Sequence, residues 1–446
     1  MKTRWLKTAL AVAVSAMSTQ LMASGFALNE QSISGMGTSF AGRSSSADDA
    51  TTLFGNPAGM ARLKREEVSF GMAAIHAKTD IDDASGSFFN GAGPTPIGGP
   101  TSGSNDGDMV PTTAVPMGYY VKPIDDKWAL GVGVYVPFGL ITDYEGGFQG
   151  RYFGDYSEVR VITVQPTVSY RFNEKLSIGF GPTINRIDGQ LESAVPGIAG
   201  LNDSRVKIEG DDTALGFNAG LLYEFTPHTR AGITYHSSVD YKLEGDTKVS
   251  GSDPVLGNGI PVLSINAYGK YDASLDLETP ESVDVSITHE LNANWTLYAG
   301  AMWTRWSRLE EITVENEGVG AAAAGQFGTI TEEQDWHDTW SYALGAAYKL
   351  NPQWTLRTGL AFDQSPANNT HRSPRIPTGD RTAVSVGLGW SPTEDITVDL
   401  AYSYLMEEEV SIDQSKTYAD GAVGQSYSSK YENSAHGFGA ALSYRF

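Results

Sequence analysis

The pattern that decides the fold is cleanest at the end of the chain, where residues 437–446 read GFGAALSYRF. Apolar side chains occupy every second position from Phe438 to Phe446, and small or polar residues stand between them. Successive strand residues point to opposite faces, so this period of two predicts a β-strand with one apolar face. The same alternation recurs upstream, at residues 340–348, 382–390 and 396–404.

The start of the chain indicates secretion. Lys2, Arg4 and Lys7 precede an apolar run at residues 8–17, and a short polar stretch ends near Ala23. This is the pattern of a signal peptide, and the apolar run is shorter than the roughly 20 residues that a membrane-spanning helix needs. We therefore predict a signal peptide at residues 1–23 and a protein that is exported from the cytoplasm.

The composition excludes several classes. The 446 residues include no cysteine and only 40% hydrophobic residues, with 50 Gly, 21 Tyr, 17 Phe and 9 Trp. These values exclude a disulfide scaffold and a helical membrane protein, and they fit a membrane β-barrel, whose aromatic residues gather at the two interfaces. The net charge of −22 excludes a nucleic-acid partner and is explained by solvated loops or by cation binding at the cell surface.

The spacing of the connections gives a strand count. Six very short turns alternate with seven longer segments rich in Gly, Pro and acidic residues, so the sequence predicts 14 antiparallel strands between residue 64 and Phe446. Short turns alternating with long loops are typical of bacterial outer-membrane barrels. The short turns are predicted at 122–127, 173–175, 226–228, 291–294, 351–353 and 392–395, and the long loops at 78–109, 137–157, 191–212, 246–267, 313–336, 365–379 and 411–430. Residues 268–290 count as one strand despite Pro280.

Residues 24–63 show no strand period and are rich in Gly, Ser and Ala. They include Asn56-Pro57-Ala58, which together with the segment that begins Ser24-Gly25-Phe26 closely resembles the N-terminal hatch of the FadL family of outer-membrane fatty-acid and hydrocarbon transporters. Further matches lie at residues 304–307, 354–366, 375–377 and 380–381, so the resemblance extends from the hatch to the barrel.

The resemblance implies a monomeric barrel of 14 strands in the outer membrane of a Gram-negative bacterium, with residues 24–63 as a hatch in the lumen and no energy source of its own. The implied partners are a hydrophobic ligand, outer-membrane lipid with lipopolysaccharide, and the barrel assembly machinery. The implied function is passive uptake of long-chain fatty acids. Uptake of aromatic or alkane hydrocarbons is the alternative, and a general diffusion porin is a weaker one.

The family is also expected to release its ligand sideways. Strand three carries Gly131 and Gly133, which weaken packing, and in the family this strand is kinked beside the Asn-Pro-Ala element. The resemblance thus implies a lateral opening in the wall at these glycines. Alternatively, Asn56-Pro57-Ala58 is only a turn that seats the hatch.

The loop after strand three is unusually apolar for an exposed segment. In the family the corresponding loop helps to form an extracellular groove that captures ligand, and packing against a neighbouring loop explains the same composition equally well. The candidate groove residues are Phe138, Leu140, Ile141, Phe148, Tyr152 and Phe153.

Basic residues in the lumen could bind a carboxylate, because arginine offers bidentate geometry to it. Period counting places His337, Lys349, Arg357 and Arg381 on lumen faces, and pairing with lumen acids is at least as good an explanation for any one of them. Alignment with the family suggests Arg186 and His337, although strict alternation puts Arg186 on the lipid face unless a bulge at 181–182 turns it inward.

No catalytic motif is present. The seven histidines show no metal-ligand spacing, and neither a nucleophile elbow, nor a phosphate loop, nor a dinucleotide fingerprint occurs. We therefore predict a protein without enzymatic activity, catalytic residues, metal or cofactor.

Overall fold

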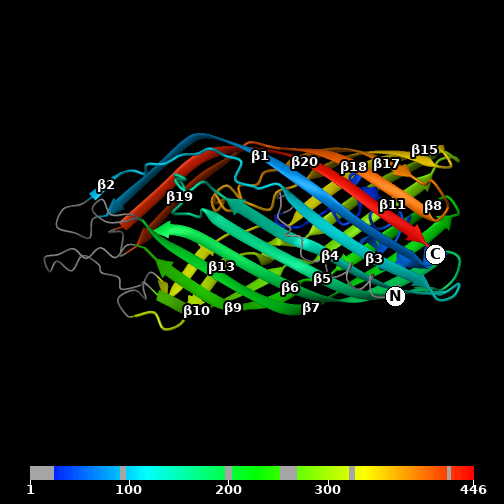
Figure 1. Cartoon of the computed structure of the whole chain (residues 1–446), viewed down its shortest axis with the longest axis horizontal. Coiled ribbons are helices and arrows are strands. Elements are labelled where there is room, and N and C mark those ends of the chain that lie inside the picture. The colour runs from blue at the N-terminus through cyan, green and yellow to red at the C-terminus, as the bar shows by residue number, and fades with distance from the viewer. Residues whose placement is uncertain (1–24, 91–96, 196–202, 252–268, 321–326, 419–422) are drawn as a thin grey trace, which may run out of the picture.

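The first and last strands of the chain lie side by side and close the sheet into a barrel (Figure 1). In the computed structural model, β1 (Glu67–Asn90) pairs with β20 (Val423–Arg445) in an antiparallel ladder that begins at Glu67 and Arg445. The structure describes residues 25–90, 97–195, 203–251, 269–320, 327–418 and 423–446. The predicted signal peptide lies outside these residues.

The barrel has the predicted 14 strands. Five of them consist of two consecutive segments each, and the short β2 (Ile97–Pro100) extends the hairpin of β1. Besides β1 and β20, the single strands are β3 (Thr113–Pro123), β4 (Trp128–Asp143), β5 (Tyr156–Arg171), β6 (Leu176–Val195), β7 (Ser204–Thr226), β16 (Trp354–Asp363) and β17 (Arg381–Trp390). The two-segment strands are β8 (Thr229–His236) with β9 (Val239–Ser250), β10 (Gly269–Thr279) with β11 (Ser282–Glu290), β12 (Trp295–Thr304) with β13 (Glu311–Asn316), β14 (Thr329–Glu333) with β15 (Thr339–Asn351), and β18 (Ile396–Glu407) with β19 (Val410–Tyr418).

The short turns occur where they were predicted, at the end of the barrel that holds the C-terminus (Figure 1). Six of the seven long loops are shorter than predicted, because the strands continue into them, whereas the loop between β16 and β17, at residues 364–380, is slightly longer. For example, β6 reaches Val195 and β7 begins at Ser204, although a loop was expected at 191–212. The extensions of β6 and β7, at residues 191–195 and 204–212, carry several charged side chains and lack the continuous apolar face that marks a strand inside the membrane.

Alternation sorts the side chains of each strand. On β6, Ile178, Phe180 and Ile184 are exposed on the outer surface, whereas Ser177 and Thr183 are buried toward the lumen. This outer band of apolar side chains suits contact with lipid, and the polar inner face suits a filled lumen. Among the described residues, no helix is long and apolar enough to cross a bilayer.

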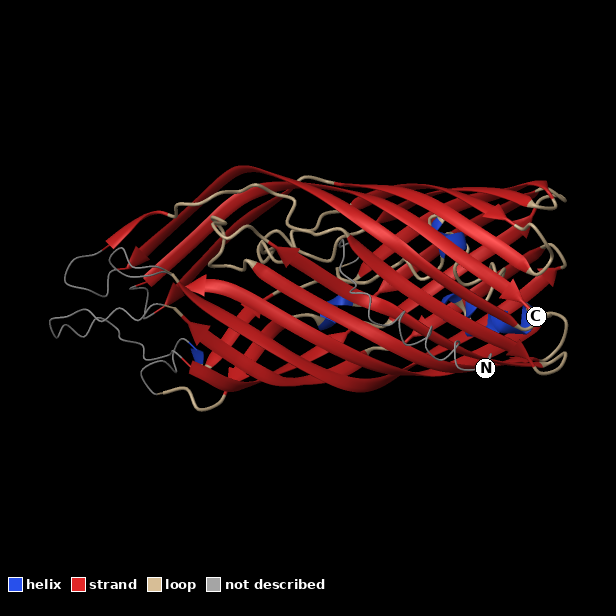
Figure 2. Cartoon of the chain, viewed as in Figure 1, coloured by secondary structure: helices blue, strands red, loops and turns tan. Residues whose placement is uncertain are grey.

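The short helices lie inside the barrel (Figure 2). They are α2 (Ile33–Met36), α3 (Thr52–Gly55) and the 3-10 helix η1 (Pro57–Arg62). Residues 25–63, which we call the hatch, occupy the lumen and bring Ile33, Met36 and Leu53 into the main hydrophobic cluster of the wall. The hatch is therefore packed as part of the core rather than as a loose tail.

Candidate functional site

Hydroxyl groups fasten the hatch to the wall. Ser39 hydrogen-bonds to Ser385 of β17 at 2.7 Å, and Ser45 to Thr288 of β11 at 2.8 Å. On the neighbouring strand β8, the buried Arg230 is paired with Thr288 and donates from Nε to the carbonyl of Ser45 at 2.8 Å. Such contacts satisfy the polar groups of a segment that has little regular structure of its own.

Glycines of the wall allow the hatch backbone to come close. A Cβ added at Gly232 would lie 1.8 Å from the carbonyl oxygen of Ser44, and one at Gly220 would lie 2.0 Å from Oδ1 of Asn56. A Cβ at Gly179 would lie 2.3 Å from the carbonyl carbon of Pro57. The lumen face thus carries glycine wherever the hatch approaches the strands most closely.

The Asn-Pro-Ala triplet lies against β6, β7 and β8. Asn56 donates from Nδ2 to the carbonyl of Leu221 at 3.0 Å and to that of Ser44 at 2.7 Å, while its Oδ1 accepts from the amide of Ala58 at 3.0 Å. The expectation that the triplet sits against Gly131 and Gly133 is therefore wrong.

Gly131 and Gly133 instead accommodate Leu53 of the hatch, whose methyl carbons would lie 2.7 and 3.0 Å from Cβ atoms added at these positions. Both glycines are paired with β3 on one side and with β5 on the other. The wall is continuous there, so the lateral opening expected at these two residues is misplaced.

The hydrogen-bonded ladder of β4, the third strand of the barrel, is interrupted closer to its extracellular end. β3 pairs with β4 only up to Gly118 and Val134, and the register between β4 and β5 shifts between Tyr135 and Phe138, where Pro137 lies. The start of the hatch takes over the free edge of β4: the amide of Leu28 donates to the carbonyl of Pro137 at 2.8 Å. The amide of Gly139 donates to the carbonyl of Phe26 at 2.9 Å. Residues 26–28 therefore cover the break, which we call the β4 kink.

Two tryptophans hold the beginning of the hatch. The ring of Phe26 lies 4.9 Å from Trp306 and 6.2 Å from Trp336, measured between centroids. Gly25 has φ +63°, and a Cβ there would lie 2.5 Å from the ring of Trp336. Only glycine fits both the left-handed backbone and the space between the rings.

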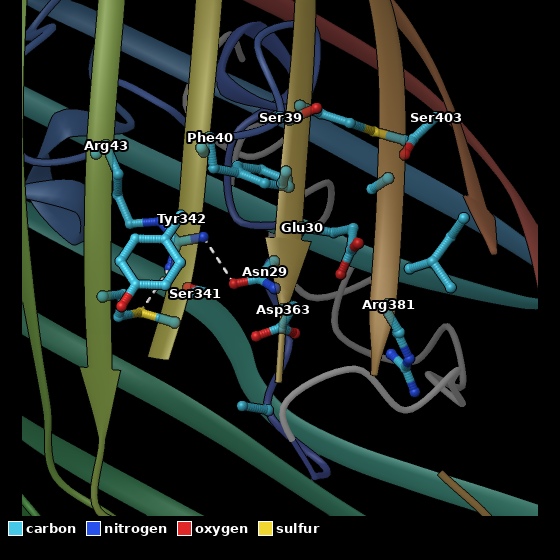
Figure 3. Close-up of a pocket in the computed structure, with 18 of the residues that line it drawn as sticks. Asn29, Glu30, Ser39, Phe40, Arg43, Ser341, Tyr342, Asp363, Arg381 and Ser403 are labelled. Carbon is cyan, nitrogen blue, oxygen red and sulfur yellow. Dashed lines mark hydrogen bonds between the residues drawn. The ribbon is translucent and has the colours of Figure 1, made fainter. Parts of the chain in front are cut away.

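One cavity lies between the hatch and the strands β15 to β18 (Figure 3). This inner cavity has a volume of about 100 Å³ and is lined by both signs of charge, with Arg43 and Arg381 beside Glu30, Asp284 and Asp363. Burial raises the pKa of the Glu30 carboxyl, and Arg43 and Arg381 lower it only in part. The inner cavity therefore has charged groups of both signs in a lining that is otherwise mostly apolar.

A second cavity, the kink cavity, lies between the hatch and the β4 kink and has a volume of about 70 Å³. Pro137 and Phe138 line it from β4, and Val239 and Tyr241 from β9. It shares four lining residues with the inner cavity, namely Ala27, Asn29, Arg43 and Met302. The two cavities are thus separated only by these side chains.

A third cavity of about 60 Å³ lies in the extracellular half of the barrel and is lined almost entirely by apolar side chains. We call it the apolar cavity. Its lining includes Val159, Ile187, Leu243, Leu275 and Leu277, which belong to the same hydrophobic cluster as Val239 and Tyr241 of the kink cavity. One cluster therefore connects the apolar cavity with the kink cavity.

The lumen arginines predicted by alternation are in place but paired. Arg357 donates to Asp399 at 2.6 Å, and Arg381 donates from Nε to Glu407 at 2.8 Å. Arg381 also lines the inner cavity, and its buried Nη1 has no hydrogen-bond partner within the described part of the chain. Pairing with lumen acids, one of the two explanations, therefore holds for both.

The two residues suggested by alignment do not reach the lumen site. No register shift interrupts the pairing of β6 with β7, so Arg186 points outward, 52% exposed, and pairs with Asp211 at 3.0 Å. His337 lies exposed in the segment between β14 and β15, where the alternation is broken, and its neighbour Trp336 is the buried residue. The proposed carboxylate role is wrong for Arg186 and unsupported for His337.

The candidate groove residues are buried in the structure. Phe148 is fully buried, stacked on Tyr144 at 3.8 Å and set edge-on to Tyr427 at 5.4 Å. Ile141, Tyr152 and Phe153 join the same extracellular cluster, Leu140 packs with Trp306, and only the partly buried Phe138 borders a cavity. The structure thus favours packing as the explanation for these side chains, which form no open groove among the residues that the structure describes.

The described residues contain no group of three or more His, Asp or Glu side chains arranged to hold a metal ion. Alternation does not reveal Arg43, which lines the inner and the kink cavities, because the hatch has no period. The only available signal is its place among the few basic residues of a segment predicted to lie in the lumen.

Comparison with known proteins assigns this chain to a family. A family model described as outer membrane protein transport protein (OMPP1/FadL/TodX) matches residues 14–446. The chain belongs to this family. It is consequently an outer-membrane protein of a transport family and not an enzyme.

Named members of the family match along nearly the whole chain. The long-chain fatty acid transport protein of Escherichia coli O6:H1 is 31% identical over 100% of this chain and 99% of its own length. Outer membrane protein P1 of Haemophilus influenzae is 30% identical over 95% of each chain. The crystal structure of a Pseudomonas aeruginosa FadL homologue has a TM-score of 0.81 at 25% identity, over 95% of this chain and 100% of that one.

Proposed function

We propose that this protein takes up long-chain fatty acids passively across the outer membrane. The observation that carries the proposal is the sequence of cavities in a lumen filled by the hatch: an apolar cavity on the extracellular side, then the kink cavity, then the charged inner cavity. An amphiphile with an apolar tail and a charged head matches the step from an apolar cavity to cavities that carry charged side chains. The relatives named long-chain fatty acid transport protein support the same class of ligand.

The apolar cavity would receive the tail. Each methylene removed from water contributes about 0.8 kcal/mol, so a long acyl chain binds such a lining without any energy source. Its wall consists of Ile187, Leu243, Leu275 and similar side chains. This cavity replaces the loop groove as the proposed place of capture, since the loop residues are already packed.

Release would occur at the β4 kink. There the strand ladder ends at Val134, and residues 26–28 of the hatch occupy the free edge through two backbone hydrogen bonds and the packing of the Phe26 ring. A few such bonds can be exchanged more easily than a continuous ladder. Movement of this segment would connect the kink cavity with the membrane and let the ligand leave sideways.

A disulfide tests this route, because the chain contains no cysteine. Ala27 and Phe138 face each other in a β-bridge, and residues directly opposite in such a bridge have Cβ atoms close enough to be cross-linked. We expect the oxidised variant Ala27→Cys/Phe138→Cys to lose uptake of labelled oleate and to regain it on reduction.

The matched control is Ser87→Cys/Ser426→Cys, which crosslinks opposite residues of β1 and β20 whose hydroxyls lie 2.7 Å apart. It should transport oleate in both redox states. Normal uptake by the oxidised Ala27/Phe138 variant, with crosslinking verified by mass spectrometry, would refute release at the kink.

Aromatic or alkane hydrocarbons remain the second candidate substrates. The aromatic side chains at the kink, Phe26, Phe138 and Trp306, and the small size of the cavities favour them. Uptake of labelled toluene, hexadecane and oleate by the same cells, each in competition with the other two, would separate the classes of substrate. If the cells take up the hydrocarbons but no oleate, the first proposal is ruled out.

A further inference from the structure

Most arginines that face the lumen have a carboxylate partner. The distances from guanidinium nitrogen to carboxylate oxygen are 2.6 Å for Arg357 and Asp399, 2.8 Å for Arg381 and Glu407, 2.9 Å for Arg230 and Glu290, and 2.9 Å for Arg445 and Glu67. A charge taken out of bulk water is stable only when it is paired or well hydrogen-bonded. Pairing is thus the rule in this lumen.

Arg43 of the hatch departs from the rule. Within the described part of the chain it forms no salt bridge, and its hydrogen bonds go from Nη2 to Oδ1 of Asn29 at 2.7 Å and from Nη1 to the sulfur of Met302 at 3.3 Å. The rest of its surroundings includes the ring of Phe40, 5.1 Å away, and the carboxyls of Glu30 and Asp284, which line the inner cavity with it but lie beyond salt-bridge distance. A guanidinium has five N–H donors, and a thioether is a weak acceptor, so Arg43 has capacity left for an anion.

The kink cavity offers a binding site for an anion beside Arg43. Its lining contains no Asp or Glu, and Arg43 is its only permanently charged side chain, with His236 as the other basic residue. The inner cavity, by contrast, would set an anion beside Glu30, Asp284 and Asp363. Electrostatics therefore favours the kink cavity for a negatively charged head group.

A second donor borders the same cavity. Tyr241 is 3% exposed, and its hydroxyl has Thr279 nearby but no partner with good hydrogen-bond geometry within the described residues. A buried hydroxyl without a partner is unfavourable and gains by donating to a ligand. Beyond Tyr241, the hydrophobic cluster of Val239 and Leu243 leads to the apolar cavity, in the direction that a tail would take.

We propose that Arg43, assisted by Tyr241, binds the carboxylate of the ligand in the kink cavity and makes the protein selective for carboxylic acids over neutral hydrocarbons. This inference rests on the proposed uptake function and assigns its head-group site. It locates that site on the hatch, whereas alignment placed it on barrel strands at Arg186 and His337.

The test compares oleate with methyl oleate, which keeps the tail but lacks the charge, binding to the purified protein in detergent. Arg43→Gln should weaken oleate binding about tenfold to a hundredfold, as expected for a hydrogen bond between charged groups, and leave the ester unchanged. Arg43→Lys should lie between, because lysine keeps the charge but not the bidentate geometry. Tyr241→Phe should weaken oleate binding by a smaller factor.

Arg186→Gln is the matched control, since it removes an outward-facing guanidinium and should bind both ligands like the parent. Unfolding of a variant would show as loss of heat-modifiable migration on gels. Parent-like oleate binding by folded Arg43→Gln, or equal loss of oleate and ester, would overturn the inference. If the parent itself binds neither ligand, the uptake proposal fails instead.

Discussion

At the scale of single residues, glycines shape the lumen of this barrel as much as large side chains do. Gly179, Gly220 and Gly232 leave room for the backbone of the hatch, whose carbonyls and amides then meet the wall directly. Where side chains are present and charged, as at Arg357, they are matched by acids on neighbouring strands. Arg43 fits neither pattern, because it is a charged side chain without a salt bridge among the described residues.

Gly232→Val tests the close approach of hatch and wall. The new Cβ would overlap the carbonyl of Ser44, so we expect the hatch to shift and residues 25–63 to become accessible to protease, at a cost of about 1 to 3 kcal/mol. Gly146→Val is the control, because nothing lies within 4 Å of a Cβ at that position. Equal protease resistance in both variants would show that the hatch does not depend on this contact.

The buried pair of Arg357 and Asp399 makes a second prediction. Asp399→Ala leaves a guanidinium without its partner in the lumen and should destabilise the folded barrel by about 3 to 5 kcal/mol in urea titrations. The double variant Arg357→Met/Asp399→Leu should recover most of this loss, because it removes both charges. A double variant no more stable than Asp399→Ala would contradict the pairing argument.

At the scale of elements, the decisive feature is strand three, which changes partners along its length. Below Val134 it pairs with β3, and above the kink it pairs with residues 26–28 of the hatch. Proline cannot donate to a ladder, so Pro137 marks the place where the regular pairing ends. The loop that follows folds into an aromatic cluster instead of lying open.

Phe148→Ser should loosen this loop. The fully buried ring stacks on Tyr144 and contacts Tyr427, and removal of a buried aromatic costs about 3 to 5 kcal/mol of local packing. We expect faster cleavage of residues 144–155 by surface protease, with an intact barrel on gels. Phe89→Ser, at a 47% exposed position, should have little effect, and equal cleavage in both variants would contradict the burial of Phe148.

At the scale of the whole molecule, a closed barrel with a packed lumen is a poor channel for water and ions. The hatch fills the space between strands that are far apart in the sequence, from β1 to β18, and the cavities that remain are small (Figure 2). This architecture fits selective passage of molecules that bind the wall and argues against a general diffusion porin.

Planar bilayers test this difference. We expect the parent protein to give low conductance, and a variant without residues 25–63 to give large steps, because the lumen of that barrel is no longer filled. Folding of the shortened variant is checked by heat-modifiable migration. Large, steady conductance of the parent would instead support the porin alternative.

The sequence determined the barrel, because a period of two assigns each strand residue to one face of a sheet. Alternation correctly placed Arg357 and Arg381 in the lumen and Arg186 outside, and only alignment with the family suggested an inward Arg186. Alternation also placed His337 and Lys349 in the lumen, and both are exposed, because the regular strand is interrupted before His337 and ends just after Lys349. The short turns located the strand ends for the same local reason.

Tertiary structure alone decided the contacts between segments without a period. Residues 25–63 have no alternation from which their neighbours could be read, so neither the seat of Asn56 at Leu221 nor the isolation of Arg43 follows from the sequence. The sequence of the apolar loop suited a groove and a packed cluster equally well. The structure shows the cluster, because Tyr427 of the distant strand β20 lies against Phe148 of the loop. Which side chains are buried and which charges are paired depends on residues that are far apart in the sequence and meet only when the barrel closes. The order of residues along the chain does not reveal these partners.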